Sequence, residues 1–357
     1  MFNSGSIGLE FVMFMRCLQT FFMRHLFPSM HNHYSLRQIQ EKKMKRRSLI
    51  LNSALIGAFF LLTGCTGNSI PTATPIPTTP QRAIVLGDIS DDPAEVIEGS
   101  QPLADYLAAG LSDYGITIGE VKVAKSTDEM IEMLASGEVD RYFDSVYPAT
   151  LVSDASGGQV ILRRWRYGVE EYQSVIFATK ESGITSITDL QGHMLAFDNQ
   201  FSTSGFVLPA VYLQGQGINL VGKTTFDAQV DADEAGFVFS FDDQNTLQWI
   251  QRGFVEAGAT DDYSYENLFP DDVRETLIEL ARTDYVPRQV VVVSPRMSAT
   301  MLEEVSQILL TAHESEGGRA ALEPFQTTRF DRFPEGIAAA SERMRNMVNI
   351  INTIPLP

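Results

Sequence analysis

Hydrophobic and polar positions change their period repeatedly along the chain from residue 83 onward. Short apolar or alternating runs predict strands, and apolar residues three and four positions apart predict helices. The expected strands are 83–86, 121–123, 139–143, 159–162, 173–178, 194–197, 255–259 and 289–293. The expected helices are 102–111, 126–136, 202–213, 245–252, 299–312 and 337–351. Strands separated by helices predict an α/β fold with parallel sheets covered on both faces.

Two of these elements have well-specified ends. Ser126 and Glu129 form a capping box in front of an apolar run, and Gly137 stands where that helix should stop. Ser202 is a good N-cap for the helix after strand 194–197, and Phe201 with Phe206 occupies the two positions of a hydrophobic staple. We therefore expect both helices to begin where these signals place them.

The first 65 residues follow a different pattern. A basic run, 45–47, precedes an apolar stretch, 49–62, which is too short for a comfortable membrane span and ends in small residues before Cys65. This order resembles the signal peptide and lipobox of bacterial lipoproteins, in which the cysteine receives a lipid and becomes the first mature residue. The resemblance implies a signal peptide at 44–64 and lipidation of Cys65. It also implies that translation starts at Met44 and that residues 1–43 come from a start site assigned too far upstream. A hydrophobic leader with an incidental cysteine is the alternative.

Residues 65–82 are rich in proline and threonine. Pro71, Pro75, Pro77 and Pro80 favour extended chain over packing, at roughly 3 Å per residue. We expect this segment to be a tether between the lipid anchor and the folded body.

The charge and cysteine counts limit the function of the body. Of 27 basic and 45 acidic residues, eight bases and two acids precede Cys65, which leaves about 24 net negative charges beyond it. Such a surface argues against binding nucleic acid or anionic lipid. Cys17 and Cys65 are the only cysteines, so no internal disulfide is expected. About 275 residues follow the tether, which favours two lobes.

The turn after strand 194–197 carries the strongest chemistry. Ligands of α/β sheets bind beyond the carboxyl ends of strands, where turns enter helices. Beside the Ser202 cap, Thr203, Ser204 and Gly205 would present unpaired amides and hydroxyls at the positive end of a helix dipole, which suits an anion. Pro209 cannot donate to the carbonyl of Gly205, so the helix should bend or loosen there. A simple serine-rich cap is the alternative interpretation.

Several stretches together resemble the phosphate/phosphite/phosphonate-binding proteins of ABC importers. They are 87–93, 102–107, 186–192, 201–205 and 286–288, in the order of that family. The Ser-Thr-Ser-Gly run is the most specific of them, since in the family these residues bind the phosphonyl oxygens. The resemblance therefore implies this role for Ser202, Thr203 and Ser204.

The family's fold is the type II periplasmic-binding-protein architecture, which has two α/β lobes, two crossover strands and a ligand in the cleft between the lobes. It implies a first lobe of 83–178 and 288–357, a second lobe of 179–287, and crossovers at 174–179 and 290–293. It also implies a monomeric, extracytoplasmic receptor that closes on a phosphorus oxyanion, delivers it to a membrane permease and uses no cofactor.

Five further residues are candidates for the ligand site. Asp144 stands where the family usually has glycine or apolar residues, and it either caps the next helix or faces a cationic group of the ligand. Tyr147 and Tyr172 either line the cleft or pack. Asp88 and Asp261 lie at strand ends, and Asp261 resembles the family's ligand-side acid.

Other chemistry has little support. His193 and His313 are the only histidines after Cys65, which offers neither a zinc cluster nor a Ser-His-Asp triad. We expect no catalytic residue and no metal. A receptor for a sulfonate or carboxylate, and a sensor or enzyme on the same scaffold, are the alternatives to an oxyanion receptor.

Overall fold

The structure is a computed structural model that describes residues 82–357. The predicted signal peptide, the lipidation site Cys65 and almost all of the tether lie outside the described residues. Within 82–357, every helix is too short or too polar to cross a bilayer.

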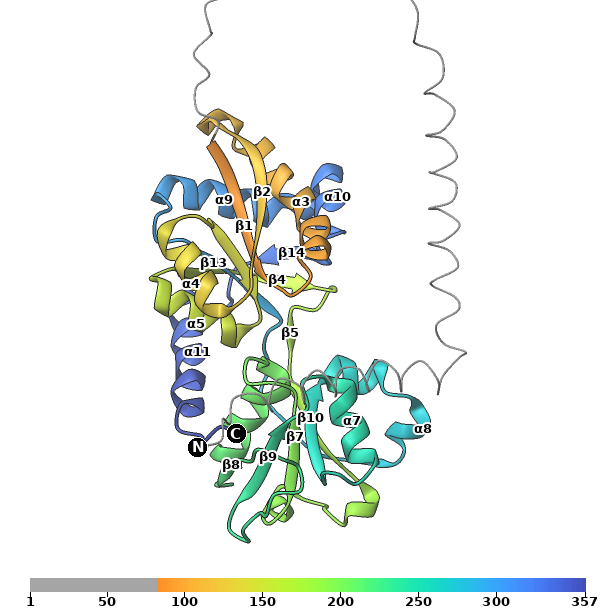
Figure 1. The fold of residues 1–357 in the computed structure, drawn as a ribbon. Coiled ribbons are helices and arrows are strands. Elements are labelled where there is room, and N and C mark those ends of the chain that lie inside the picture. The colour runs from red at the N-terminus through yellow and green to blue at the C-terminus, as the bar shows by residue number, and fades with distance from the viewer. Residues whose placement is uncertain (1–81) are drawn as a thin grey trace, which may run out of the picture. The chain divides into compact units, whose positions relative to one another are not determined.

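Two six-stranded sheets organise the described residues (Figure 1). The first sheet has the strand order β14-β4-β13-β3-β1-β2 and belongs to the first lobe. Its strands are β1 (Arg82–Ile89), β2 (Ile116–Ala124), β3 (Arg141–Asp144), β4 (Gln159–Arg166), β13 (Gln289–Val293) and β14 (Thr327–Asp331). Its helices are α3 (Pro93–Gly110), α4 (Thr127–Ser136), α5 (Val146–Ser156), α9 (Ala299–Thr311), α10 (Glu316–Leu322) and α11 (Ile337–Ile351).

The second sheet has the order β11-β6-β10-β7-β9-β8 and belongs to the second lobe. Its strands are β6 (Ser174–Thr179), β7 (Met194–Phe197), β8 (Leu220–Gly222), β9 (Ala235–Phe239), β10 (Ala257–Asp261) and β11 (Leu277–Arg282). Its helices are α6 (Leu208–Gly215), α7 (Asp243–Gln251) and α8 (Asp271–Arg274). Apolar residues of each sheet are buried against these helices, and each such side chain contributes about 1.5–3 kcal/mol.

The prediction of purely parallel sheets is wrong, because both sheets are mixed. β13 runs antiparallel to β3 and β4, and β6 runs antiparallel to β10 and β11. The start of β13 lies beside the end of β3, where Val290 pairs with Asp144. The start of β6 lies beside the end of β10, where Ser174 pairs with Asp261. A strand that arrives from the other lobe enters its sheet at the edge where the neighbouring strands end, so it must run against them.

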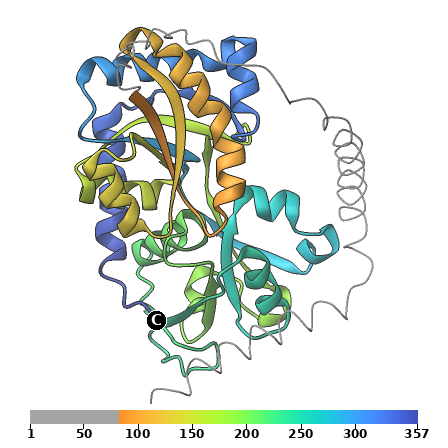
Figure 2. The ribbon, with the colours of Figure 1, turned by 45° about the horizontal axis from the view of Figure 1, so that its top comes forward.

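The two crossings between the lobes form a short ribbon of their own. β5 (Glu171–Tyr172) pairs antiparallel with β12 (Val286–Pro287) (Figures 1 and 2). The segments predicted as crossovers, 174–179 and 290–293, are instead the sheet strands β6 and β13. The ribbon strand β5 leads into β6, and the ribbon strand β12 leads into β13. The first change of lobe thus occurs before β6, whereas the expected boundary was residue 178. Strand β6 is apolar from Val175 to Ala178 and buried from Ser174 to Ala178, because it is a core strand and not a connector.

Helix α4 of the first lobe begins and ends at the residues that the sequence indicates. The amide of Glu129 donates to Ser126 Oγ at 3.2 Å, and Gly137 ends α4 with φ of 79°. The Glu129 carboxylate accepts from the amide of Lys125 at 2.7 Å, one residue before the expected Ser126 amide. The predicted N-terminus of α4 is therefore confirmed, with its reciprocal bond shifted by one residue.

Helix α11 connects the two lobes a further time. It packs on α5 and β4 of the first lobe and on α6 of the second (Figure 1). The tail beyond it reaches β8, where the amide of Gly222 donates to the carbonyl of Pro355 at 2.8 Å. A side chain at Gly222 would collide with Pro357, so this contact requires glycine.

Candidate ligand-binding site

The turn after β7 starts a π-helical turn, η4 (Thr203–Val207), which continues into α6. Ser202 is the N-cap, and its hydroxyl accepts from the amide of Gly205 at 3.0 Å, as predicted. The carbonyl of Gly205, which Pro209 cannot bond, accepts from the amide of Asp198 at 3.1 Å. The loosened helix start predicted from Pro209 is therefore present, and the freed carbonyl ties the turn to β7.

One of the three amides at the start of this turn bonds within the protein, and the other two have no acceptor in the helix. The Gly205 amide is occupied by Ser202, so the predicted set of three free amides is wrong by one. The amides of Thr203 and Ser204 lie in the first turn, where a helix provides no acceptor. Thr203 and Ser204 thus supply the donor pair at this helix N-terminus.

Gly205 allows the turn to pack closely. A Cβ at this position would lie 2.5 Å from Asp198 Cβ and 2.8 Å from Ser202 Oγ. Burial raises the pKa of Asp198, and hydrogen bonding with Ser202 lowers it in part. The hydroxyl of Ser202 is therefore engaged inside the turn, between an amide and a carboxyl group.

Thr203 joins the second lobe to the first. Its hydroxyl accepts from the amide of Tyr147 at 3.0 Å and donates to Ser145 Oγ at 3.0 Å. Ser145 is the N-cap residue of α5, so the helix that Asp144 was expected to cap is present, with its N-cap one residue later. Two helix N-termini, one from each lobe, consequently meet at the Thr203 side chain.

The two tyrosines have different places. Tyr147 is 8 % exposed with its ring in the core, and its amide donates to Thr203 of the second lobe. Tyr172 is 2 % exposed and lies on the crossing strand β5. Burial raises the pKa of Tyr172, while Arg288 and hydrogen bonding with Thr203 and Ser204 lower it. The Tyr172 hydroxyl therefore lies near the side chains of Thr203 and Ser204.

Arg288 brings a positive charge to this point. Its guanidinium carbon lies 4.5 Å from the centre of the Tyr172 ring. No salt bridge of residues 82–357 involves the Arg288 side chain, which is half-buried. Arg288 belongs to the stretch 286–288 of the family resemblance, but no local pattern in the sequence indicates that it stacks on a tyrosine of the other crossing.

Asp144 binds the residue before α5. Its carboxylate accepts from the amide of Ser145 at 2.6 Å and from the hydroxyl of Tyr142. Burial raises the pKa of Asp144. Burial also raises the pKa of Asp88 to about 6, and the charge of Asp144 adds to this rise. The carboxyl groups at the ends of β1 and β3 therefore lie close together, next to the N-terminus of α5.

Asp261 organises a turn of the second lobe. It accepts from the amide of Ser264 at 3.1 Å and from its hydroxyl at 2.6 Å. Burial raises the pKa of Asp243 to about 7, and the charges of Asp198 and Asp261 contribute. No group of three or more His, Cys, Asp or Glu side chains in 82–357 has a metal-binding arrangement. Asp198, Asp243 and Asp261 therefore lie near enough to influence one another's charge.

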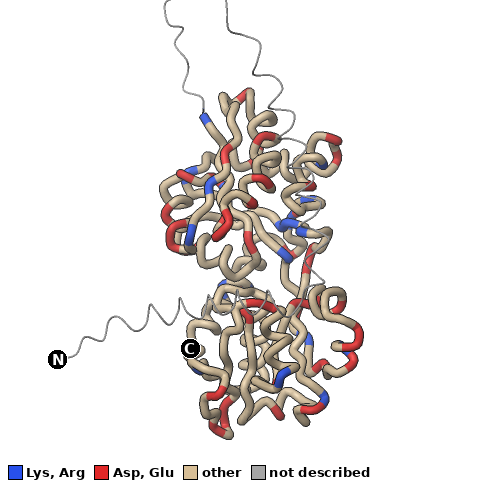
Figure 3. Tube along the Cα trace, turned by 45° about the vertical axis from the view of Figure 1, so that its right-hand side comes forward, with Lys and Arg blue, Asp and Glu red and all other residues tan. Residues whose placement is uncertain are grey.

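A cavity of about 550 Å³ opens on the first lobe beside Asp88 and Asp144. Arg164 and Arg166, both missed in the sequence analysis, line it as well. The available signal was the run Arg163-Arg164-Trp165-Arg166 in a chain dominated by acids, which Figure 3 shows on both lobes. Of the predicted site residues, Asp88 and Asp144 line this cavity, whereas Ser202 to Gly205 and Asp261 belong to the second lobe. Tyr147 starts α5 of the first lobe, and Tyr172 lies on the crossing strand β5.

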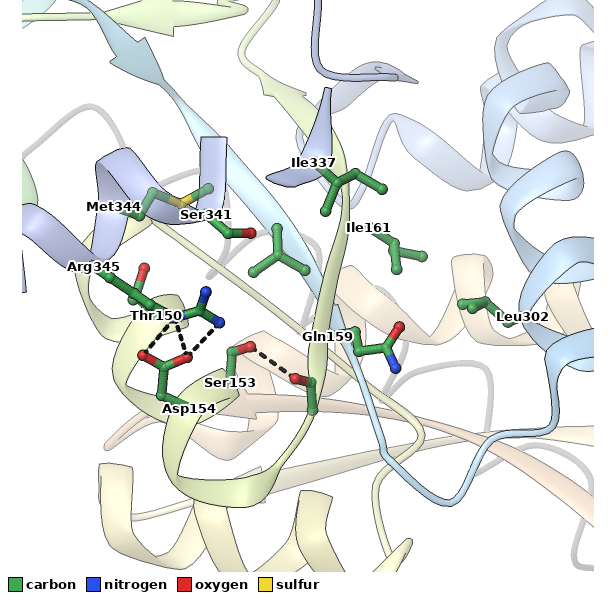
Figure 4. A pocket seen from close by; sticks show the side chains of 12 residues that line it. Thr150, Ser153, Asp154, Gln159, Ile161, Leu302, Ile337, Ser341, Met344 and Arg345 are labelled. Atoms are coloured by element: carbon green, nitrogen blue, oxygen red, sulfur yellow. Dashed lines mark hydrogen bonds and ion pairs between the residues drawn. The ribbon is translucent and has the colours of Figure 1, made fainter. Parts of the chain in front are cut away.

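A second hollow, of about 220 Å³, lies between α5, β4 and α11 (Figure 4). Asp154 and Arg345 form an ion pair at 2.9 Å on its wall. Its lining shares no residue with the cavity at Asp88 or with the donor pair, so it is a separate feature.

Comparison with known proteins agrees with this architecture. A family profile described as "ABC transporter, phosphonate, periplasmic substrate-binding protein" matches residues 89–334. The chain is similar to XAC2383 from Xanthomonas citri bound to ATP, with 26% identity and a TM-score of 0.68, over 75% of this chain and 96% of that one. The same protein bound to chloride ion matches with 27% identity and a TM-score of 0.68, over 75% of this chain and 97% of that one.

A phosphonate-binding protein shares the fold at lower identity. PhnD1 from Prochlorococcus marinus in complex with methylphosphonate is 18% identical, with a TM-score of 0.53, over 76% of this chain and 98% of that one. The expected type II periplasmic-binding-protein fold is thereby confirmed.

Proposed function

Because this chain belongs to the periplasmic substrate-binding proteins of phosphonate ABC transporters, we propose that it is a lipid-anchored receptor for a phosphonate, phosphite or phosphate oxyanion. Its family consists of transport receptors and not of enzymes, and acts outside the cytoplasm. In this proposal Cys65 carries the lipid, the tether spaces the body from the membrane, and the loaded monomer docks on the permease.

The observation that carries the proposal is the meeting of two helix N-termini at Thr203. Its side chain accepts from the α5 amide of Tyr147, and its own amide belongs to the donor pair with Ser204. Helix N-termini favour anions through free amides and the helix dipole. An oxyanion beside Ser204 would contact both lobes through this arrangement and so stabilise their closed form.

The charges nearby select the anion. Arg288, stacked on Tyr172, brings a cation to this region, and the Tyr172 hydroxyl adds a donor. Asp198 and Asp243 oppose an anion when ionised, but the raised pKa of each favours the neutral form. A ligand with a cationic group, such as 2-aminoethylphosphonate, would favour the ionised form of the same acids and would gain from their charge. A sulfonate or carboxylate is the nearest rival.

Calorimetry on the protein from Cys65 onward, without lipid, tests the proposal. The panel is phosphate, phosphite, methylphosphonate, 2-aminoethylphosphonate, methanesulfonate and acetate. We expect one phosphorus oxyanion to bind one per monomer and more tightly than about millimolar, with affinity reduced about tenfold in Ser204→Ala or Arg288→Gln. Arg345→Gln, which removes a distant guanidinium, is the matched control. Binding of methanesulfonate or acetate in preference to all phosphorus compounds would contradict the proposal.

A nucleotide is a second candidate ligand. XAC2383 was solved with ATP, and its likeness to this chain is greater than that of the methylphosphonate-bound protein. ATP therefore belongs in the same panel. Tight binding of ATP with no binding of small oxyanions would favour a receptor for nucleotides, in which the donor pair holds a terminal phosphate.

A further inference from the structure

The cavity on the first lobe extends the proposed site. We propose that it receives the uncharged end of the ligand and that this end is polyhydroxylated, so that the ligand is a phosphate ester or phosphonate of a polyol. This inference depends on the proposed binding of a phosphorus oxyanion by Thr203 and Ser204.

The size of the cavity exceeds what a small oxyanion needs. Its volume of about 550 Å³ lies within the range of about 300–1,000 Å³ that encloses small organic ligands. Methylphosphonate has only a few heavy atoms and would fill a minor part of it. Side chains from several strand ends line the space, among them Asp88, Asp144, Arg164, Arg166, Gln289 and Phe325.

The cavity lies next to the donor pair. Asp144 lines the cavity and accepts from Ser145 Oγ at 3.2 Å, and Ser145 Oγ in turn accepts from Thr203 Oγ1 at 3.0 Å. Two consecutive hydrogen bonds therefore join the cavity wall to the helix start of the second lobe. A ligand held at Ser204 needs only a short chain to reach the cavity.

Six charged residues line the cavity, and two of them, Glu95 and Glu98, are exposed. Of the other four, Arg164 and Asp144 already have hydrogen-bond partners. Arg164 donates to Thr327 Oγ1 at 2.7 Å and to Gln289 Oε1 at 2.6 Å, and also to the carbonyl of Phe325. Asp144 is held by Tyr142 and Ser145. These bonds leave Arg164 and Asp144 little capacity for a ligand.

Asp88 and Arg166 retain free capacity. Asp88 Oδ1 accepts from the amide of Ile89 at 2.7 Å. Neither Asp88 nor Arg166 takes part in a salt bridge of residues 82–357. Arg166 Nη2 donates to Gln326 at 3.0 Å, whereas its Nε is buried without a hydrogen-bond partner in this part of the chain. The cavity wall thus offers a ligand the Asp88 carboxylate as an acceptor and the Arg166 guanidinium as a donor, and these two groups form no salt bridge with each other.

A hydroxyl-rich group matches this combination. A hydroxyl donates to a carboxylate and accepts from a guanidinium, so neighbouring hydroxyls can satisfy both groups. A primary amine would satisfy Asp88 and be repelled by Arg166, and a second anion would be repelled by Asp88 and Asp144. Buried polar groups that lack partners cost free energy, and a ligand that supplies partners recovers it.

Calorimetry with ribose 5-phosphate, glycerol 3-phosphate, methylphosphonate and 2-aminoethylphosphonate tests the inference. We expect ribose 5-phosphate to bind about tenfold or more tightly than methylphosphonate. Asp88→Asn and Arg166→Gln should each reduce this preference about tenfold. Asp154→Asn and Arg345→Gln remove the same chemical groups from the separate hollow and should leave the preference unchanged. Thermal melting identifies any variant that fails to fold, and the two cavity variants are independent of each other.

The outcomes separate the two proposals. If no phosphorus compound binds, the proposed function fails and this inference fails with it. If methylphosphonate binds and the polyol phosphates gain nothing, the inference alone is overturned. If 2-aminoethylphosphonate binds most tightly and Asp88→Asn abolishes that gain, the cavity recognises a cation, which also overturns the inference.

Discussion

The hydroxyl of Thr203 accepts a hydrogen bond from the amide of Tyr147 at 3.0 Å, although the residues lie 56 positions apart in different lobes. The same hydroxyl donates to Ser145. Both bonding directions of the hydroxyl are therefore used between the lobes, and the Thr203 side chain is left with little capacity for a ligand. Thr203 thus contributes its amide to the donor pair, and its side chain holds the second lobe to the first.

Thr203→Val should favour the open form. Valine matches threonine in shape but loses both bonds to the first lobe, so the closed form loses stability. We expect a larger radius of gyration in small-angle X-ray scattering and about tenfold weaker binding of the preferred oxyanion. Thr150→Val is the matched control, since Thr150 bonds only the carbonyl of Val146 inside α5. Equal scattering of wild type and Thr203→Val would show that these bonds do not hold the lobes together.

Gly205→Ala should disrupt the turn. Its Cβ would lie within 2.8 Å of Ser202 Oγ and still nearer to Asp198, which are rigidly placed groups. We expect the free energy of unfolding to fall by about 1–3 kcal/mol and oxyanion affinity to fall as well. Gly215→Ala, at the end of α6, has nothing within 4 Å and should instead stabilise by about 0.5–1 kcal/mol. Urea denaturation measures both variants, and comparable stability of the two would argue against close packing at Gly205.

Tyr172→Phe should weaken binding without unfolding the protein. The ring remains under Arg288, but the hydroxyl facing Thr203 and Ser204 is lost. We expect about tenfold weaker oxyanion binding in calorimetry. Tyr212→Phe on α6 serves as control. Unchanged affinity in Tyr172→Phe would place the ligand elsewhere in the cleft.

Asp243 should make stability depend on pH. Burial raises its pKa from 3.8 to about 7, so the folded state binds more protons than the unfolded state between these values. Stability is then fully present below pH 4 and is lost as pH rises towards 7. We expect Tm to fall between pH 5 and 7.5 in wild type by a few degrees, and less in Asp243→Asn. Asp88, whose pKa is raised to about 6, contributes in the same direction.

Asp227→Asn, an exposed change of the same charge, controls for net charge in these melts. A Tm profile of Asp243→Asn that parallels the wild type would show that this carboxyl group is not the source of the dependence.

Local signals were sufficient for the helix start at Ser202. The hydroxyl N-cap and Pro209 each act through the backbone of neighbouring residues, so the sequence predicts their effects directly. The range of α5 was not predicted, because α5 is buried on most sides, from Val146 to Ser156, and therefore has no polar face to reveal a helical period.

Relationships between distant elements were not predictable in the same way. The stacking of Arg288 on Tyr172 requires two crossings to lie side by side, and strand direction in β6 and β13 depends on where the chain re-enters each sheet. Periodicity records which faces are buried, but it carries no information about pairing partners or direction.

The contact between Gly222 and Pro355 restricts how the lobes can move. A body linked only by the β5–β12 ribbon would be free to bend and to twist, whereas the tail after α11 adds an attachment away from that ribbon. Large twisting would stretch this attachment, so opening should follow a single preferred direction. The last residues of the chain thereby help to determine the path along which a ligand enters.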